Sequence, residues 1–294
     1  MAFSLVQRLA LGTAQFGLDY GINNQSGRPT TAVVESILRA AHEAGIGMLD
    51  TAAAYGDSEA RLGELLEGQS ESFQVVTKVA AGPAEDVSQR IRHSLDRLRR
   101  RNIYGILFHS FDGLQQHPTA WQTLVAARQA GLATRIGVSL YHPAQARWLL
   151  ENIPEVDLVQ VPLNVLDQRF IPLLPDLAAR GIEVHVRSVF LQGLLLRNLA
   201  TLPVFFEPLR PKLQALQHLA TDANLPFEAL PLLFAAQTPG VARVVVGVDS
   251  AENLRANAAT ANHADTAERL RPQLLAMAEP TEEFILPYTW PPTR

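Results

Sequence analysis

The chain has 294 residues, with 25 basic and 29 acidic side chains and a net charge of -4, so its charge does not predict binding to nucleic acid or to an anionic membrane. Hydrophobic residues make up 47% of it, enough for a sizeable core, and the absence of cysteine excludes disulfides and thiolate chemistry. Its start lacks the pattern of a signal peptide, and no stretch approaches the ~18–20 apolar residues of a membrane helix. We therefore expect a soluble, cytoplasmic globular protein.

Short apolar runs alternate with amphipathic segments along the whole chain. The runs predict strands at residues 8–13, 46–50, 73–79, 104–109, 135–139, 157–162, 183–188 and 243–248. The amphipathic segments predict helices at residues 31–44, 57–67, 84–101, 117–130, 142–151 and 168–180, with a longer helical insertion at 209–237. Signals for helix starts are Thr30, His117-Pro118 and His142-Pro143, and signals for helix ends are Gly45, Gly131 and Gly181.

Eight nearly continuous apolar strands, each followed by helical sequence, predict an α/β fold of the parallel (β/α)₈ TIM-barrel type. A doubly wound sheet is the alternative, but no G-x-G-x-x-G follows the first strand. After residue 262 the sequence predicts a further helix and an ordered C-terminal arm. No linker or repeat divides the chain, so residues 1–294 are expected to form one domain.

Polar residues stand at the carboxyl ends of the predicted strands, where barrels of this kind place their chemistry. They are Asp50 with Tyr55 in the following loop, Lys78, His109, Ser139, Gln160 with Asn164 beyond it, and Arg187-Ser188. A lysine in a buried strand is costly unless a carboxylate pairs with it, and Asp50 is placed to do so. The ammonium would stabilise the Tyr55 phenolate, so this tyrosine could exchange a proton near neutral pH, while His109 could position a carbonyl oxygen.

Each of these residues alone is more often structural than catalytic, but four of them on consecutive strand ends favour an active site. The surrounding motifs resemble those of the aldo-keto reductases, especially the bacterial members. They are LGTAQFG, LDTAAAYGDSEARLGELL, VVTKV, LFH, IGVS, VQVPLN, QGLL and VDSAENLRAN, in the order of that family and over nearly the whole chain. The resemblance implies a catalytic tetrad of Asp50, Tyr55, Lys78 and His109. It also implies hydride transfer from C4 of a reduced nicotinamide to an aldehyde or ketone, sugar-like compounds included.

The same resemblance implies which residues hold the cofactor. They are Gly12, Thr13, Asp50, Ser139, Gln160, Arg187, Ser188, Gly247, Asn253 and Asn257. This sequence departs from the family pattern in three places. Leu140 replaces a frequent asparagine, and Arg187 replaces an aromatic residue that often stacks on the nicotinamide. Gly247 and Asn253 replace the Lys and Arg that often bind the 2′-phosphate of NADP. NADP remains the default expectation with NAD possible, and Arg255 would compensate if it faced the cofactor.

Two other functions stay open at this stage. The barrel could bind the cofactor as a redox sensor or regulatory subunit, or it could use the Tyr55–Lys78 pair as a non-redox lyase or isomerase. The expected partner is a small-molecule carbonyl compound, without nucleic acid, membrane or metal, and the sequence carries no signal for an oligomeric state. The basic stretch 90–102 is expected to present its arginines to solvent, and His185 beside Glu183 lacks further ligands at metal-binding spacing. Possible residues of the pocket rim are Asp19-Tyr20, Gln168-Arg169, Phe190 and Trp290.

Overall fold

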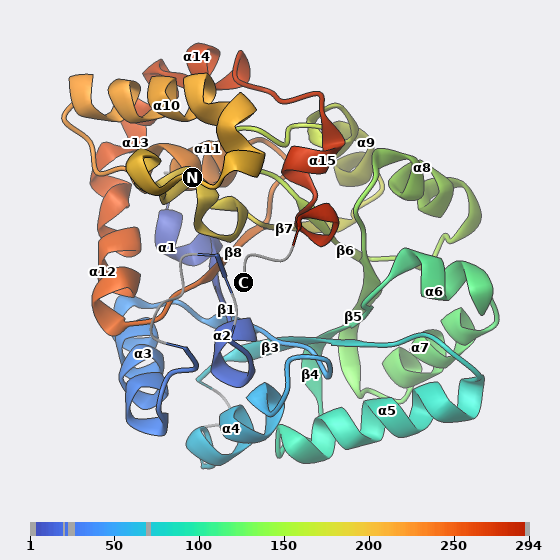
Figure 1. The fold of residues 1–294 in the computed structure, drawn as a ribbon. Coiled ribbons are helices and arrows are strands. Elements are labelled where there is room, and N and C mark those ends of the chain that lie inside the picture. The colour runs from blue at the N-terminus through green and yellow to red at the C-terminus, as the bar shows by residue number, and fades with distance from the viewer. Residues whose placement is uncertain (1–3, 20, 23–26, 69–71, 292–294) are drawn as a thin grey trace.

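The eight predicted strands form a closed parallel barrel in which each strand pairs with the next and β8 pairs with β1 (Figure 1). The computed structural model of the chain describes residues 4–19, 21–22, 27–68 and 72–291. The strands are β1 Leu9–Gly12, β2 Met48–Asp50, β3 Gln74–Val79, β4 Ile103–Phe108, β5 Ala133–Ser139, β6 Leu158–Pro162, β7 Glu183–Arg187 and β8 Arg243–Gly247. The predicted fold class and all eight predicted strands are confirmed.

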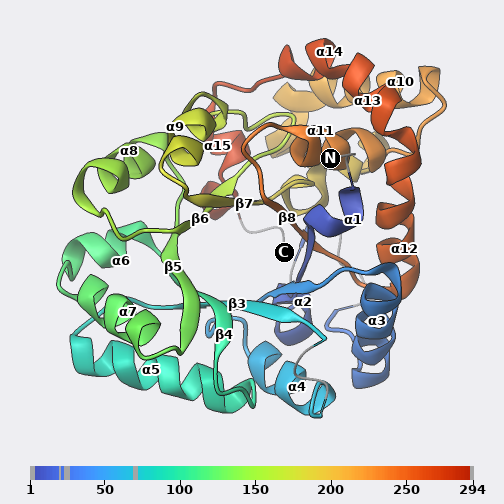
Figure 2. The same cartoon turned by 180° about the vertical axis from the view of Figure 1, so that it is seen from behind.

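Helices surround the barrel on its outer side, and α1 lies at the amino end of β1 (Figure 2). The α-helices are α1 Leu5–Arg8, α2 Ala14–Gly17, α3 Thr31–Ala44, α4 Ser58–Leu65, α5 Ala84–Arg97, α6 Phe111–Gln116, α7 Ala120–Gln129, α8 Pro143–Asn152, α9 Leu174–Ala179, α10 Arg210–Asp222, α11 Ala229–Gln237, α12 Ala251–Ala259, α13 Ala264–Arg269, α14 Arg271–Leu275 and α15 Glu282–Ile285. The 3₁₀ helices are η1 Ile171–Leu173, η2 Leu191–Leu196, η3 Leu199–Thr201, η4 Val204–Leu209, η5 Thr260–His263 and η6 Pro287–Thr289.

Most of the predicted helix boundaries hold because the local capping chemistry is present. The Thr30 side chain accepts a hydrogen bond from the Val33 amide, and Pro143 begins α8. The three glycines predicted to end helices all have positive φ, between 69° and 80°. His117-Pro118 instead separates α6 from α7, which begins only at Ala120.

The predicted helical insertion 209–237 contains two separate helices. These are α10 and α11, joined by a turn in which Asn224 takes a left-handed conformation with φ 53°. Pro226 follows this turn, and proline lacks the amide hydrogen that would continue helix α10. The predicted tail helix is likewise divided, into α13 and α14, with Pro272 in the first turn of the second.

The expectation that the arginines of residues 90–102 face solvent holds for Arg92, Arg99 and Arg101, which are exposed, but not for two others. Ile91, Leu95 and Leu98 are buried as predicted. Arg97, however, donates from Nε to Oε2 of Glu59 at 2.8 Å, and Arg100 donates to the carbonyl of Phe73 at 2.7 Å. Arg97 thus ties α5 to the buried carboxylate of Glu59 on α4, and Arg100, which follows α5, contacts the backbone at Phe73.

Alternation along the strands decides which side chains enter the barrel. Five buried residues, Ala10, Met48, Val76, Leu107 and Leu158, form their own apolar cluster, with Val245 packed against it. Side chains two positions apart on a strand share a face. Gly12, Asp50, Lys78, His109, Gln160 and Gly247 each stand two residues beyond one of these positions. The apolar layer therefore forms the floor of the site at the carboxyl ends of the strands.

In the described part of the chain, no helix is both long and apolar enough to cross a membrane. The assignment of residues 1–294 to one domain stays a prediction.

Candidate active site

A cavity of about 580 Å³ opens at the carboxyl ends of the strands. Every residue that the sequence predicts for catalysis or cofactor binding lines it: Gly12, Thr13, Asp50, Tyr55, Lys78, His109, Ser139, Gln160, Arg187, Ser188, Gly247, Asn253 and Asn257. They come from β1 to β8 and from α12, so parallel strands have brought together residues more than 200 positions apart. Their roles in catalysis and binding remain predictions.

A buried ion pair lies at the centre of the site. The Lys78 Nζ donates to Oδ1 of Asp50 at 2.6 Å and to the carbonyl of Thr51 at 3.0 Å. Both side chains are almost fully buried. Burial alone would lower the pKa of Lys78, but the charges of Asp50 and Tyr55 and hydrogen bonds to them raise it above its ordinary value. The lysine therefore remains an ammonium ion.

The second oxygen of Asp50 has a partner that the sequence did not suggest. The Gln160 Nε2 donates to Oδ2 of Asp50 at 2.7 Å. With Lys78 on one oxygen and Gln160 on the other, the carboxylate is held in one orientation. The predicted contact of Gln160 with a nicotinamide carboxamide stays a prediction. The side-chain nitrogen of Gln160 already donates a hydrogen bond to Asp50.

Tyr55 and His109 lie beside this ion pair. The Lys78 ammonium is 5.2 Å from the centre of the Tyr55 ring, and the Tyr55 and His109 rings pack edge to face with their centres 5.7 Å apart. Burial, together with the positive charges of Lys78 and Arg187, lowers the pKa of His109 to about 4 despite the charge of Asp50. His109 is therefore neutral at physiological pH and can donate only one ring hydrogen bond to a ligand at a time.

Close backbone contacts hold the loop that carries Tyr55. The Ala53 amide donates to the carbonyl of Lys78 at 2.9 Å, which joins the loop to β3. The α2 helix packs so tightly against it that a Cβ on Gly17 would lie 1.8 Å from the Tyr55 carbonyl oxygen. Gly56, with φ 56°, faces the same helix, and a Cβ there would lie 2.4 Å from the carbonyl oxygen of Gly17. The glycine after Tyr55 thus permits the close approach that positions the phenol.

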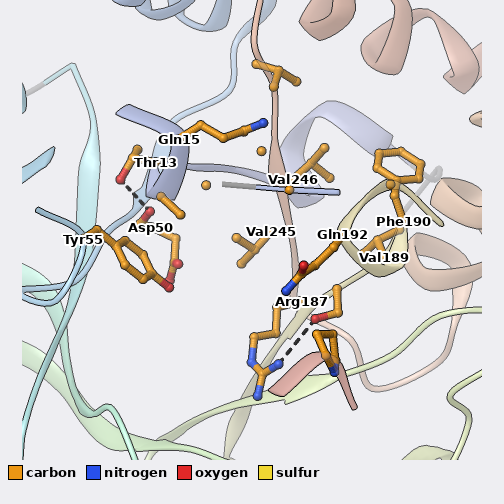
Figure 3. Close-up of a pocket in the computed structure, with 18 of the residues that line it drawn as sticks. Thr13, Gln15, Asp50, Tyr55, Arg187, Val189, Phe190, Gln192, Val245 and Val246 are labelled. Atoms are coloured by element: carbon orange, nitrogen blue, oxygen red, sulfur yellow. Dashed lines mark hydrogen bonds between the residues drawn. The ribbon is translucent and has the colours of Figure 1, made fainter. Parts of the chain in front are cut away.

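Arg187 reaches the cavity from the other side of the barrel mouth (Figure 3). It donates to the carbonyl of Leu140 at 3.0 Å and to the Ser188 hydroxyl at 3.3 Å. Its guanidinium carbon lies 4.1 Å from the centre of the Tyr141 ring. Leu140, one of the departures from the family pattern, therefore contributes its backbone to the site.

Several residues that line the cavity were not predicted from the sequence. They are Gln15, Tyr141, Gln192, Glu228, Asp249 and Tyr288, among others. Gln15, Gln192 and Asp249 stand inside the quoted motifs, so the signal was present, whereas Glu228 and Tyr288 carry none. Of the possible rim residues, Phe190 lines the cavity; Asp19, Gln168, Arg169 and Trp290 do not, and Tyr20 lies outside the described residues.

Two other predicted residues have structural roles. Asn164 is fully buried, donates to the Ser188 carbonyl at 3.0 Å and accepts from the amides of Leu166 and Asp167. Arg255 does not line the cavity, and its Nη2 lies 3.7 Å from Oε2 of Glu43 on α3. The compensation that Arg255 would have offered to a 2′-phosphate is therefore absent from this structure.

Three comparisons with known proteins bear on this site. The model of the Aldo/keto reductase family matches residues 8–271. Among solved structures, PA4992 from Pseudomonas aeruginosa, a protein assigned to the aldo-keto reductases, is 26% identical over 89% of this chain and 90% of its own, with a TM-score of 0.68. The holo form of aldo-keto reductase AKR11C1 from Bacillus halodurans is 22% identical over 90% and 91%, with a TM-score of 0.72, which shows a shared fold. The search of curated proteins found no match.

Proposed function

Because this chain belongs to the aldo/keto reductase family, we propose that it interconverts an aldehyde or ketone with the alcohol, using a nicotinamide cofactor and Tyr55 as the proton donor. One observation carries this proposal: a phenol and a neutral imidazole face a cavity directly beside a buried Lys78–Asp50 pair. Such a pair of groups can hold a carbonyl oxygen and deliver a proton to it.

Each side chain would have a distinct part in the reduction. Tyr55 would donate its phenolic proton to the carbonyl oxygen as the alcohol forms. Lys78, held as an ammonium ion by Asp50, would stabilise the phenolate left behind. His109 is neutral, so its ring can donate a hydrogen bond that orients the carbonyl without adding a charge. Asp50 and Gln160 would act as positioning residues, since Asp50 binds Lys78 and Gln160 binds Asp50.

The cavity wall fits a dinucleotide because bare backbone lines part of it. Gly12 and Gly247 lie side by side in the register of β1 and β8. A Cβ on Gly247 would lie 2.6 Å from Oε1 of Gln15, and one on Gly12 would lie 3.1 Å from Cγ1 of Val245. Glycines at such a place allow a ligand to approach the backbone closely. When bound, a reduced nicotinamide supplies the hydride for this reaction, and Ser139, Gln160, Arg187, Ser188, Asn253 and Asn257 would help to hold the cofactor.

The charges at the α12 end of the cavity favour NADH, although the resemblance made NADP the default. Asp249 and Asn253 line this end, and the Asn253 amide donates to the Asp249 carboxylate. Among the described lining residues the lysines and arginines are Lys78 and Arg187, both at the strand ends. A 2′-phosphate near α12 would meet the Asp249 carboxylate, and no described lining residue at that end carries a positive charge to offset it, whereas a ribose hydroxyl could donate to that carboxylate.

The first test is a titration of the purified protein with NADH and NADPH, followed by quenching of protein fluorescence. We expect NADH to bind about 10-fold more tightly or better, the effect of roughly one unfavourable charge contact. Asn253→Arg should shift this ratio toward NADPH, while Arg255→Met, outside the cavity, should not. Binding of neither dinucleotide would contradict the reductase function and favour non-redox chemistry. Tight binding with no turnover of any aldehyde or ketone would favour a redox sensor. The cytoplasmic location stays a prediction.

A further inference from the structure

We propose that Arg187 binds a carboxylate of the substrate, so that the protein acts on carbonyl compounds that carry an acidic group, such as 2-oxo acids or aldehyde acids. This inference rests on the proposed reductase function and specifies its substrate class.

Arg187 is a cation of the cavity without an ionic partner in the described part of the chain. Its hydrogen bonds go to the Leu140 carbonyl and the Ser188 hydroxyl, and its remaining contact is the ring of Tyr141. All three partners are uncharged. A half-buried guanidinium loses hydration without gaining a counter-charge, and an anionic ligand would offset that cost.

Neighbouring cations are balanced by acids, which makes Arg187 an exception. Lys78 pairs with Asp50 at 2.6 Å. Arg169, which also contacts Tyr141 through its carbonyl, donates to both oxygens of the buried Asp167 at 2.8 Å and pairs with Glu282. Both of these neighbouring cations thus have a carboxylate partner, whereas Arg187 has none among the described residues and keeps spare N–H donors at the cavity.

The position of Arg187 suits an anion next to the reacting carbonyl. It lines the same cavity as Tyr55 and His109, and its charge contributes to the low pKa of His109, so it is electrostatically close to that ring. Figure 3 shows the Tyr55 ring and the Arg187 side chain reaching into the cavity from different sides. A substrate whose carbonyl oxygen lies at Tyr55 and His109 could thus present a carboxylate to Arg187.

The backbone around Arg187 is held in one conformation. Ser188, Leu191 and Gln192 all have left-handed φ angles, between 49° and 60°, which non-glycine residues rarely adopt. The Asn164 amide fixes the Ser188 carbonyl, and the Leu163 amide donates to the Arg187 carbonyl at 3.1 Å. Strained backbone that is fixed in this way is typical of functional sites, and here it presets the direction of the guanidinium.

The test compares pairs of probes in which one member carries a carboxylate and the other a neutral ester or amide, with the enzyme saturated by the reduced dinucleotide that binds more tightly. Phenylglyoxylate and its methyl ester serve as substrates, and oxamate and oxamide as ligands that are not reduced. We expect the acid to have the higher kcat/KM and oxamate to bind more tightly than oxamide. Arg187→Met should reduce kcat/KM for the acid and the affinity for oxamate by about 10- to 100-fold, and Arg187→Lys by less. Because Arg187 is also a proposed cofactor contact, the deciding quantities are ratios: the preference for the acid over the ester, and for oxamate over oxamide, should fall by about 10-fold or more in Arg187→Met. Arg255→Met is the matched control.

Three outcomes would overturn the proposal. In the first, the acid and the ester have equal kcat/KM and Arg187→Met changes neither value; this would overturn the proposed substrate class but not the reductase function. Oxamate could bind no better than oxamide, which decides the question even if neither substrate is turned over. Arg187→Met could weaken dinucleotide binding and leave oxamate unaffected, which would assign the guanidinium to the cofactor diphosphate. If the variant does not fold, raising NaCl from about 20 to about 300 mM must weaken oxamate but not oxamide in the unmodified protein.

Discussion

The two ends of the barrel hold similar side chains in different surroundings. At the carboxyl end, Asp50, Lys78 and His109 lie around Tyr55 and face a cavity. Toward the amino end, Tyr104 donates to Glu183, whose other oxygen lies 2.8 Å from Nε2 of the fully buried His185. None of the residues of this second group lines the cavity.

The two ends differ in whether the phenol of the tyrosine is used to bind a carboxylate. Burial and Glu183 raise the pKa of Tyr104, so its phenol keeps its proton and serves to bind the carboxylate. At the other end Lys78 and Gln160 bind the carboxylate, and the phenol of Tyr55 faces the cavity. An acid, a histidine and a tyrosine therefore do not by themselves predict an active site; the proposal rests on the lysine that pairs with the acid and on the cavity beside the phenol. Four experiments test this comparison.

The largest effect is expected from removing one hydroxyl at each end. Tyr55→Phe should lower kcat for carbonyl reduction by about 10²- to 10⁴-fold, the usual contribution of a general acid, with little change in stability. Tyr104→Phe makes the same chemical change at the other end, and should leave kcat unchanged but lower the free energy of unfolding by about 1–2 kcal/mol. Steady-state kinetics and urea unfolding check both; full activity in Tyr55→Phe would refute the proposed mechanism.

Removing one cation at each end of the barrel should lower the free energy of unfolding by different amounts. Lys78→Met leaves the buried Asp50 charge without its partner, so the free energy of unfolding should fall by about 3–5 kcal/mol. Arg135 faces Glu183 at 3.8 Å with its side chain 40% exposed, so Arg135→Met should cost about 1 kcal/mol or less. Adding Asp50→Asn to Lys78→Met should recover part of the loss in a double-mutant cycle. Equal losses for the two single variants would show that the ends do not differ in this way.

Acid should weaken the amino end at low pH. Burial alone would raise the pKa of Glu183, but hydrogen bonds from His185 and Tyr104 and the charges of His185 and Arg243 lower it to about 2. A carboxyl group whose pKa is lowered on folding stabilises the fold at pH values above its pKa in the unfolded chain, here 4.5. This contribution is lost as the pH falls from 4.5 toward 2. Glu183→Gln should therefore be less stable by about 2–3 kcal/mol at pH 6, and the difference should shrink over that window.

His109 should produce an effect of similar size in a higher pH window. Its pKa of about 4 lies below its ordinary 6.5, so the unfolded chain binds a proton that the folded protein does not. The neutral His109 ring makes its full contribution to the free energy of unfolding above pH 6.5, and this contribution is lost as the pH falls toward 4. His109→Gln should remove about 2–3 kcal/mol of this pH dependence. Parallel unfolding curves for variant and parent between pH 7 and pH 4 would contradict the assignment.

Local patterns in the sequence determined the architecture and the members of the site. Asp50, Lys78, His109 and Gln160 could be placed together because strand periodicity is local, and the carboxyl ends of parallel strands necessarily meet at one end of a barrel. Capping residues such as Thr30 and Gly45 likewise act within a few residues, so their effect is readable in the chain.

Only the tertiary structure decided the partners of these residues. Gln160 binds Asp50 across 110 positions, and Tyr288 from the C-terminal arm reaches the cavity beside Tyr141, with no sequence signal for either contact. Arg255 faces Glu43, and Arg187 has no carboxylate partner in the described part of the chain, although the sequence placed both arginines at or near the predicted site. The physical reason is that a side chain's type and periodicity are local properties, whereas its ionic partner depends on the distances between segments that only the closed barrel sets.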